Sequence, residues 1–213
     1  GPAQISGRNR VVIASTSSTL NAYPSAEGGY FSDVFWTALG QNRDLKTAFD
    51  AAKQAVQATG LSQQPWLDDN GDAVADAEDG ALAHERGLAG AFAGNPPVID
   101  WVHVDDAGHK TMLQAQVRDD FGVAKVWAEV YAPDFEEPEP SQDGTTPVVN
   151  LPRTTLILAG NDLYDAHYPL TQTGTYRLVF YALDDEGHRA SPQVTTISPG
   201  AMYVYLPLML RGK

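Results

Sequence analysis

The sequence predicts an α/β domain followed by an all-β sandwich, and three observations lead to this prediction. The first 94 residues hold one short apolar strand and then segments whose apolar residues recur at helical spacing. Asn95-Pro96-Pro97 is a linker signal, and beyond it the hydrophobic pattern alternates with period two. An apolar tail closes the chain. We therefore divide the sequence into residues 1–94, 95–199 and 200–213.

The first part is predicted to contain one strand and three helices. Val11–Ser15 is a continuous apolar run of the kind found in a parallel sheet that is covered on both faces. Helices are predicted at Tyr30–Leu39, at Asp44–Thr59 with Asp44 as its cap, and at Gly80–Ala91. Because these helices need more sheet than one strand provides, we expect further strands from an upstream segment, unless a strand in this part has been overlooked. The abrupt start of the chain just before this strand suggests such a segment.

An acidic loop separates the two parts. Six acidic residues lie between Asp68 and Asp79, and no Lys or Arg occurs between Lys53 and Arg86. The loop follows the alternating oxygen-ligand spacing of an EF-hand-type calcium loop, although Ala73 stands where Gly is expected and Asp79 where a bidentate Glu is expected. The predicted calcium ligands are Asp68, Asn70, Asp72, the Val74 carbonyl, Asp76 and Asp79. The alternative is a solvated acidic turn held by hydrogen bonds to its own backbone.

The second part is predicted to be an antiparallel sandwich of about seven short strands separated by Asp- and Gly-rich turns. The predicted strands are Val98–Val104, Thr111–Val117, Val123–Tyr131, Thr154–Leu158, Thr175–Leu183, Val194–Ile197 and Tyr203–Leu206. The Pro- and Glu-rich segment Asp134–Asn150 is predicted to be a loop that does not pack. The tail Tyr203–Leu210 is expected to dock as an edge strand on the sandwich or on a partner.

The aromatic residues of the second part have two interpretations. Trp101, Trp127, Tyr131 and Tyr181 could form a binding strip for carbohydrate or protein. Aromatic residues of a sandwich more commonly pack in the core or on a sheet face, and we favour packing.

Composition limits the classes of function. The 213 residues are 43% hydrophobic and 9% aromatic, which is typical of a folded protein. The net charge of −13 opposes binding to nucleic acid or to anionic membranes and favours cations or basic ligands. The absence of cysteine excludes disulfides, zinc–thiolate sites and a cysteine nucleophile within this chain. No apolar run is long enough for a membrane span, the five histidines show no metal-binding spacing, and no G-x-S-x-G motif is present.

Several segments resemble, in order and spacing, the half of a legumain-like, caspase-fold bacterial cysteine peptidase that follows the catalytic cysteine. They are RVVIAST, Ala22-Tyr23, GGYFSDVFWTAL, DLKTAFDAAKQAV and the P-W-LDDNGD loop, and the resemblance as a whole covers roughly Ile5–Gly94. The second part resembles the immunoglobulin-like sandwich that follows the peptidase in such proteins. VAKVWAEVYAP carries this resemblance, and Tyr176 stands where a tyrosine corner is expected.

The resemblance implies that residues 1–94 are the C-terminal portion of a three-layer α/β/α peptidase domain. The catalytic Cys and His would lie on an upstream fragment, so this chain is expected to hold no catalytic residue and to be inactive alone. Ser15, Thr16 and Ser17 would border the pocket for the substrate residue before the scissile bond, or would merely end a strand. The implied partners are that fragment and a peptide or protein substrate, and the implied location is the bacterial exterior, secreted or at the cell surface. The competing hypothesis is a non-catalytic extracellular adhesion or structural module with a calcium-stapled loop.

Overall fold

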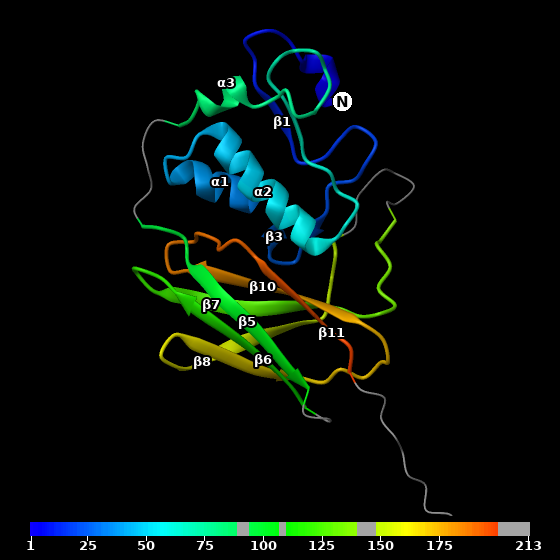
Figure 1. Ribbon diagram of the computed structural model, residues 1–213, viewed down its shortest axis with the longest axis vertical. Coiled ribbons are helices and arrows are strands. Elements are labelled where there is room, and N and C mark those ends of the chain that lie inside the picture. The colour runs from blue at the N-terminus through cyan, green and yellow to red at the C-terminus, as the bar shows by residue number, and fades with distance from the viewer. Residues whose placement is uncertain (89–93, 107–109, 140–147, 200–213) are drawn as a thin grey trace, which may run out of the picture.

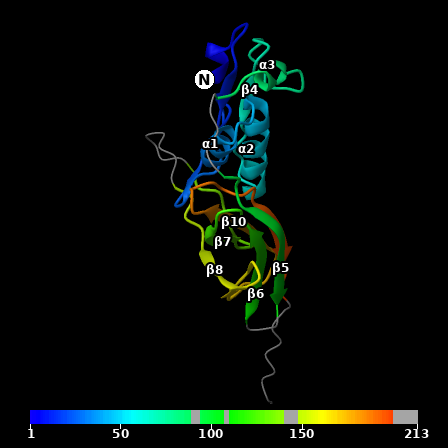
Figure 2. The same ribbon diagram turned by 90° about the vertical axis from the view of Figure 1, so that its left-hand side faces the viewer.

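A computed structural model of the chain describes residues 1–88, 94–106, 110–139 and 148–199. Its helices form a layer that lies on one side of a β-sandwich, as both views show (Figures 1 and 2). The elements of the first part are η1 (Pro2–Ile5), β1 (Val12–Ala14), β2 (Pro24–Ser25), β3 (Gly28–Gly29), α1 (Ser32–Gly40), α2 (Leu45–Thr59), β4 (Trp66–Asp68) and α3 (Ala81–His84). The tail beyond residue 199, with its predicted strand Tyr203–Leu206, lies outside the described residues.

The predicted strand Val11–Ser15 is present as β1, but its expected place in a parallel sheet is not what the structure shows. β1 pairs antiparallel with β4, with Val12 opposite Asp68, and the two form a two-stranded sheet. The sequence analysis missed β4 because three residues are too few to show a period. No other described strand pairs with either of them.

The helix predictions are correct in kind and differ in length. α2 begins after Asp44, whose side chain accepts a hydrogen bond from the Thr47 amide, and it ends at Gly60, which adopts the left-handed conformation at φ 66°. α1 ends at Gly40, as its pattern predicts to within a residue. The third helix was predicted over Gly80–Ala91, yet α3 spans only Ala81–His84 in the described part of the chain.

The second part is the predicted antiparallel sandwich. Its strands are β5 (Val98–Asp106), β6 (Thr111–Arg118), β7 (Val123–Tyr131), β8 (Arg153–Gly160), β9 (Leu163–Tyr168), β10 (Tyr176–Asp184) and β11 (Gln193–Ile197). They pair in the order β11-β10-β7-β8-β9-β6-β5. β8 pairs with β7 through one half and with β9 through the other, so it passes from one sheet to the next. The two ends of the order, β5 and β11, then contact each other and complete the sandwich.

The central strands β7 and β10 are buried on both faces, because the helical layer covers the face that a free sandwich would expose to water. Val126, Ala128 and Val130 point into the core between the sheets. The alternate residues Trp127 and Tyr131 belong instead to a second hydrophobic cluster, shared with α1 and α2. Packing, rather than a ligand strip, is therefore the role of these aromatic side chains.

The segment between β7 and β8 corrects the prediction of a loop that does not pack. In its described residues, Phe135 contacts the shared cluster, Val149 is 3% exposed, and the Val149 amide donates to the Pro24 carbonyl at 2.9 Å. Glu137 accepts hydrogen bonds from the Ser62 amide and hydroxyl at 2.9 and 2.6 Å. Hydrogen bonds to the first part offset the unfavourable composition of this segment.

Two further features bear on the type of protein. The hydroxyl oxygen of the buried Tyr176 accepts a hydrogen bond from the Gln172 amide at 2.7 Å, which is the contact of a tyrosine corner and supports an immunoglobulin-like sandwich. Among the described residues, no helix is both long and apolar enough to span a membrane.

Candidate functional site

The acidic loop begins where β4 ends, so the small sheet holds its first residue in place. The Asp68 side chain is fully buried, and its two oxygens accept hydrogen bonds from the amides of Gly71 and Ala73 at 2.8 and 2.9 Å. Burial by itself raises the pKa of the Asp68 carboxyl, but hydrogen bonds to the carboxyl, these two among them, outweigh burial and hold the pKa below its ordinary value. The loop therefore starts from an ionised, rigidly held carboxylate.

Ala73 adopts the backbone conformation that a calcium loop needs at this position, although Gly is expected there. This residue stands where Gly is expected, and its φ of 66° is the left-handed conformation that the turn needs. Gly71, with φ 85°, provides a second left-handed residue, and a Cβ there would lie 2.7 Å from the Gly7 carbonyl carbon. The loop thus turns in the way that the calcium motif requires, although one of the two residues is not Gly.

The carboxylates of the loop are held apart by hydrogen bonds to the backbone. Asp72 accepts from the Val74 amide at 2.8 Å, Asp76 from the Glu78 amide at 2.8 Å, and Asp79 from the amides of Asp69 and Asp76 at 3.0 Å each. Among the described residues, three His, Asp or Glu side chains bring their ligand atoms within 4.8 Å of one another at a different place, the turn after β10. The loop has the spacing and the turn of a calcium site, but its carboxylates do not converge on one point.

The predicted substrate border lies at the end of β1, where one buried glutamine fixes its geometry. The Gln63 side chain donates to the Ser15 carbonyl at 2.8 Å and accepts from the Tyr23 amide at 3.0 Å. Ser15 lines a cavity of 210 Å³ on one side of Gln63, and Ser17 lines a separate cavity of 380 Å³. The Thr16 hydroxyl is buried and makes no hydrogen bond to the described residues.

Gln63 is therefore a residue of this candidate site that the sequence analysis missed. It is 5% exposed and joins the strand end to the loop that follows it, although 40 residues separate it from Tyr23. A polar residue in a loop carries no signal of such a contact. Only the antiparallel return of the chain into β4 brings it there.

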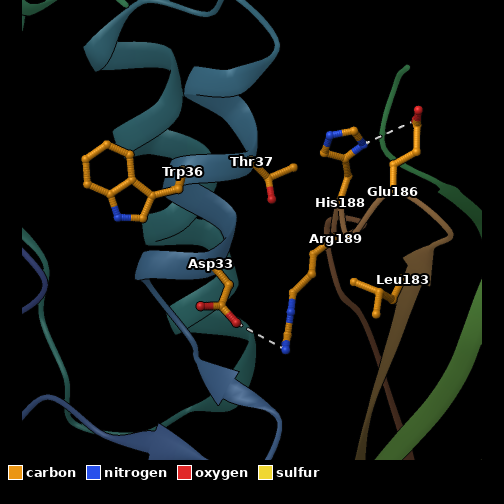
Figure 3. Close-up of a pocket in the computed structure, with 8 residues that line it drawn as sticks. Asp33, Trp36, Thr37, Leu183, Glu186, His188 and Arg189 are labelled. Atoms are coloured by element: carbon orange, nitrogen blue, oxygen red, sulfur yellow. Dashed lines mark ion pairs between the residues drawn. The ribbon is translucent and has the colours of Figure 1, made fainter. Parts of the chain in front are cut away.

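A cavity of 610 Å³ lies where α1 meets the turn after β10 (Figure 3). The turn holds the Asp184, Glu186 and His188 group. His188 Nδ1 lies 2.9 Å from an Asp184 oxygen and 3.8 Å from a Glu186 oxygen. The other Asp184 oxygen accepts from the amides of Glu186 and His188 at 2.9 and 2.7 Å.

These contacts show that Asp184, Glu186 and His188 stabilise the turn by hydrogen bonding to one another. Both Asp184 oxygens are engaged within the turn itself, and Asp184 is 1% exposed. Across the cavity, Asp33 is paired with Arg189 at 3.1 Å, and the Trp36 ring extends away from both (Figure 3). Asp, Glu and His side chains can all bind metal ions, but here the Asp184 carboxylate already accepts hydrogen bonds from within the turn.

Neither a family model nor a curated protein matches the sequence. Solved structures match weakly. The PKD1 domain from Vibrio cholerae metalloprotease PrtV has 16% identity over 50% of this chain and 100% of that one, with a TM-score of 0.34. A bromine derivative of BhCBM56 has 8% identity over 46% of this chain and 88% of that one, with a TM-score of 0.31. The fibronectin type-III domain of human fibronectin type III domain containing protein 3 has 16% identity over 54% and 94%, with a TM-score of 0.28.

TM-scores this low carry no argument about function. The strand order and the tyrosine corner of this chain are what identify its second part as an immunoglobulin-like β-sandwich.

Proposed function

We propose that this chain is the C-terminal, non-nucleophile portion of a secreted, calcium-binding, caspase-fold cysteine endopeptidase. The proposal combines the resemblance over Ile5–Gly94 with one structural observation, the small size of the β1–β4 sheet. Helices α1 and α2 pack on the sandwich, and the described residues of the first part pair only β1 with β4 and the two-residue strands β2 and β3. A sheet of this size leaves backbone donors and acceptors free at its outer edges, where further strands can add.

The upstream fragment would supply those strands together with the catalytic pair. Peptide hydrolysis by a cysteine peptidase needs a thiolate and an adjacent histidine, and this chain has no cysteine. The contribution of this chain is the scaffold and one wall of the cleft. Ser15, Thr16 and Ser17 would stand at the rim, and Gln63 would hold the backbone of that rim in position through the Ser15 carbonyl.

Calcium is proposed to bind the acidic loop and to rigidify the end of β4. The oxygen donors named from the sequence, Asp68 to Asp79, would turn inward as the ion replaces hydrogen bonds from the loop amides. Asp68 already has its carboxylate ionised and fixed, whereas Asp72 and Asp76 are on the exposed side of the loop. These two residues would make the largest movement.

The test is to reconstitute the enzyme. The encoded upstream segment is mixed with this chain, and cleavage of a peptide library is measured with and without calcium. Activity should arise only in the mixture and should vanish when the upstream cysteine is replaced by Ala. An upstream segment without a Cys and His pair would contradict the proposal and favour the non-catalytic extracellular module.

A Gln63→Glu variant provides the matched control for the cleft wall. This change keeps the size of the side chain but replaces the amide group that donates to the Ser15 carbonyl. We expect impaired cleavage with unchanged association of the two fragments. Equal loss of association and cleavage would mean that Gln63 acts on folding alone.

A further inference from the structure

The contact between the two parts of the chain is centred on a buried carboxylate. Glu129 lies near the C-terminal end of β7 and is 4% exposed. Its Oε2 atom accepts a hydrogen bond from the Tyr30 hydroxyl of the first part at 3.1 Å and from the Tyr181 hydroxyl of β10 at 3.2 Å. One carboxylate oxygen thus joins the helical part to the sandwich.

Basic residues of the sandwich also contact the first part. Four of the chain's 14 basic residues take part: Lys125, Arg153, Arg177 and Arg189. Two of them, Lys125 and Arg153, bind the Glu27 carboxylate at 2.9 and 2.7 Å.

The other two, Arg177 and Arg189, contact residues of α1 and the end of α2. Arg189 pairs with Asp33 at 3.1 Å and donates to the Glu27 carbonyl. Arg177 lies against Gly60 at the C-terminal end of α2, where the helix dipole favours a positive charge. In a chain of net charge −13, this concentration of cations indicates an interface built on electrostatics as well as on apolar packing.

We propose that Glu129 makes the docking of the sandwich onto the first part depend on pH, so that the two parts are held most firmly in mildly acidic solution and less firmly as the pH rises. The Glu129 carboxylate is buried between the two parts of the chain, and it accepts hydrogen bonds from Tyr30 of one part and Tyr181 of the other.

The ionisable groups around Glu129 fix the sign of the effect. Burial raises the pKa of Glu129, against the opposing hydrogen bonds from Tyr30 and Tyr181 and the charges of Arg153 and Arg189. The docked state therefore holds the Glu129 proton more tightly than the undocked state does. Its advantage is complete below the ordinary pKa of Glu and is lost as the pH rises through the raised pKa.

Other groups at the interface set the limits of this window. The hydrogen bond from Lys125 lowers the pKa of Glu27, so the Glu27 pairs are lost only as the pH falls through that lowered value. Burial raises the pKa of Tyr30, Tyr131 and Tyr181, so these hydroxyls stay protonated throughout. Docking is thus strongest between the lowered pKa of Glu27 and the raised pKa of Glu129.

Amide hydrogen exchange of the full chain tests the proposal. At each pH, wild type is compared with Glu129→Gln, so that the intrinsic pH dependence of exchange cancels. The protection of Tyr30–Phe35 in wild type should fall relative to the variant as the pH rises through the raised pKa of Glu129, by at most about tenfold per pH unit, since one proton is involved. Protection of Leu113–Val117, inside the sandwich core, should not change.

Two more variants make the result decisive. Glu136→Gln removes an exposed carboxyl from the same part of the chain and should keep the wild-type profile. Tyr30→Phe removes a hydrogen bond that favours the ionised carboxylate, so it should enlarge the loss of protection at high pH. The proposal is wrong if wild type and Glu129→Gln show the same profile, or if Glu129→Gln is the less protected of the two at pH 8.

Discussion

Asp68 and Asp69 are neighbours in sequence, but their carboxylates bind different segments of the chain. Asp68 is fully buried beneath the loop and fixes its first turn, whereas Asp69 is 6% exposed and reaches across to α3. The two Asp69 oxygens accept from the amides of Gly80 and Ala83 at 2.9 and 2.8 Å. The carboxylates of this loop repel one another, but hydrogen bonds from backbone N–H groups to these carboxylates stabilise it.

Replacing Asp69 by Ala should destabilise the first part even without calcium. Two buried amides would lose their acceptor, and each such loss costs roughly 1–3 kcal/mol. Urea unfolding in the presence of a chelator measures the change. Asp72→Ala is the matched control, because Asp72 is exposed and its loss should change stability by less than about 0.5 kcal/mol.

Calcium should distinguish these two residues in the opposite way, because Asp72 is a predicted ligand and Asp69 is not. Excess calcium should stabilise wild type, by about 2.7 kcal/mol when the free ion is at 100 times Kd. Asp72→Ala should abolish most of this gain, whereas Asp69→Ala should retain it. Thermal unfolding with calcium and with chelator gives the answer, and an unchanged Tm in wild type would exclude the site.

At the scale of the elements, α2 has a capping residue at each end, Asp44 at its start and Gly60 at its end. Asp44 accepts from the Thr47 amide at 2.8 Å and the Thr47 hydroxyl at 2.7 Å, and it lies 3.0 Å from His84 of α3. Burial raises the pKa of Asp44, but the hydrogen bonds from Thr47 outweigh it and lower the pKa. The cap therefore works best when Asp44 is ionised.

Asp44→Ala should cost about 1 kcal/mol of stability near neutral pH, the usual value for a lost N-cap. Because the folded-state pKa of Asp44 is lowered, this contribution is present above the ordinary pKa of Asp and is lost as the pH falls through the lowered value. Unfolding curves of wild type and variant should therefore converge in acid. A difference that persists at low pH would assign the effect to packing instead.

Elements with a clear period could be predicted from the sequence, and very short or irregular ones could not. α2 and β6 show 3.6- and 2-residue repeats, and their bounds agree with the structure to within a residue. β4 has three residues, and β9 alternates no buried and exposed positions, so neither gives a signal. The site shows the same limit. The acidic loop is visible as composition, but the contact of Gln63 with Ser15 depends on how the chain returns.

At the scale of the whole molecule, the two parts share one of the two hydrophobic clusters. Tyr30, Phe31 and Phe35 pack with Trp127, Tyr131 and Tyr181, and the Trp127 and Tyr181 rings stack at 5.2 Å. The sandwich has a complete core of its own between its sheets. The sequence shows that both faces of β7 and β10 are apolar, but it does not say what covers the second face.

Residues 95–199 expressed alone should melt cooperatively, because their inner core needs nothing from the first part. Removal of residues 1–94 should nevertheless expose Trp127, Tyr131 and Tyr181 as an apolar patch and cause self-association. Calorimetry and analytical ultracentrifugation measure the two effects. A monomeric sandwich that melts cooperatively would show that the patch is tolerated in water, and a molten profile would refute the domain boundary.

The central claim is that the edge of the β1–β4 sheet is completed by an upstream segment that carries the catalytic pair. Amide hydrogen exchange of Val12–Ala14 measures this directly when the full chain is mixed with the encoded upstream segment. The claim predicts that amides of β1 that are not bonded to β4 become protected on mixing, while those of β6 do not change. Exchange of β1 that is the same with and without the upstream segment, under conditions where the two fragments associate, would contradict it.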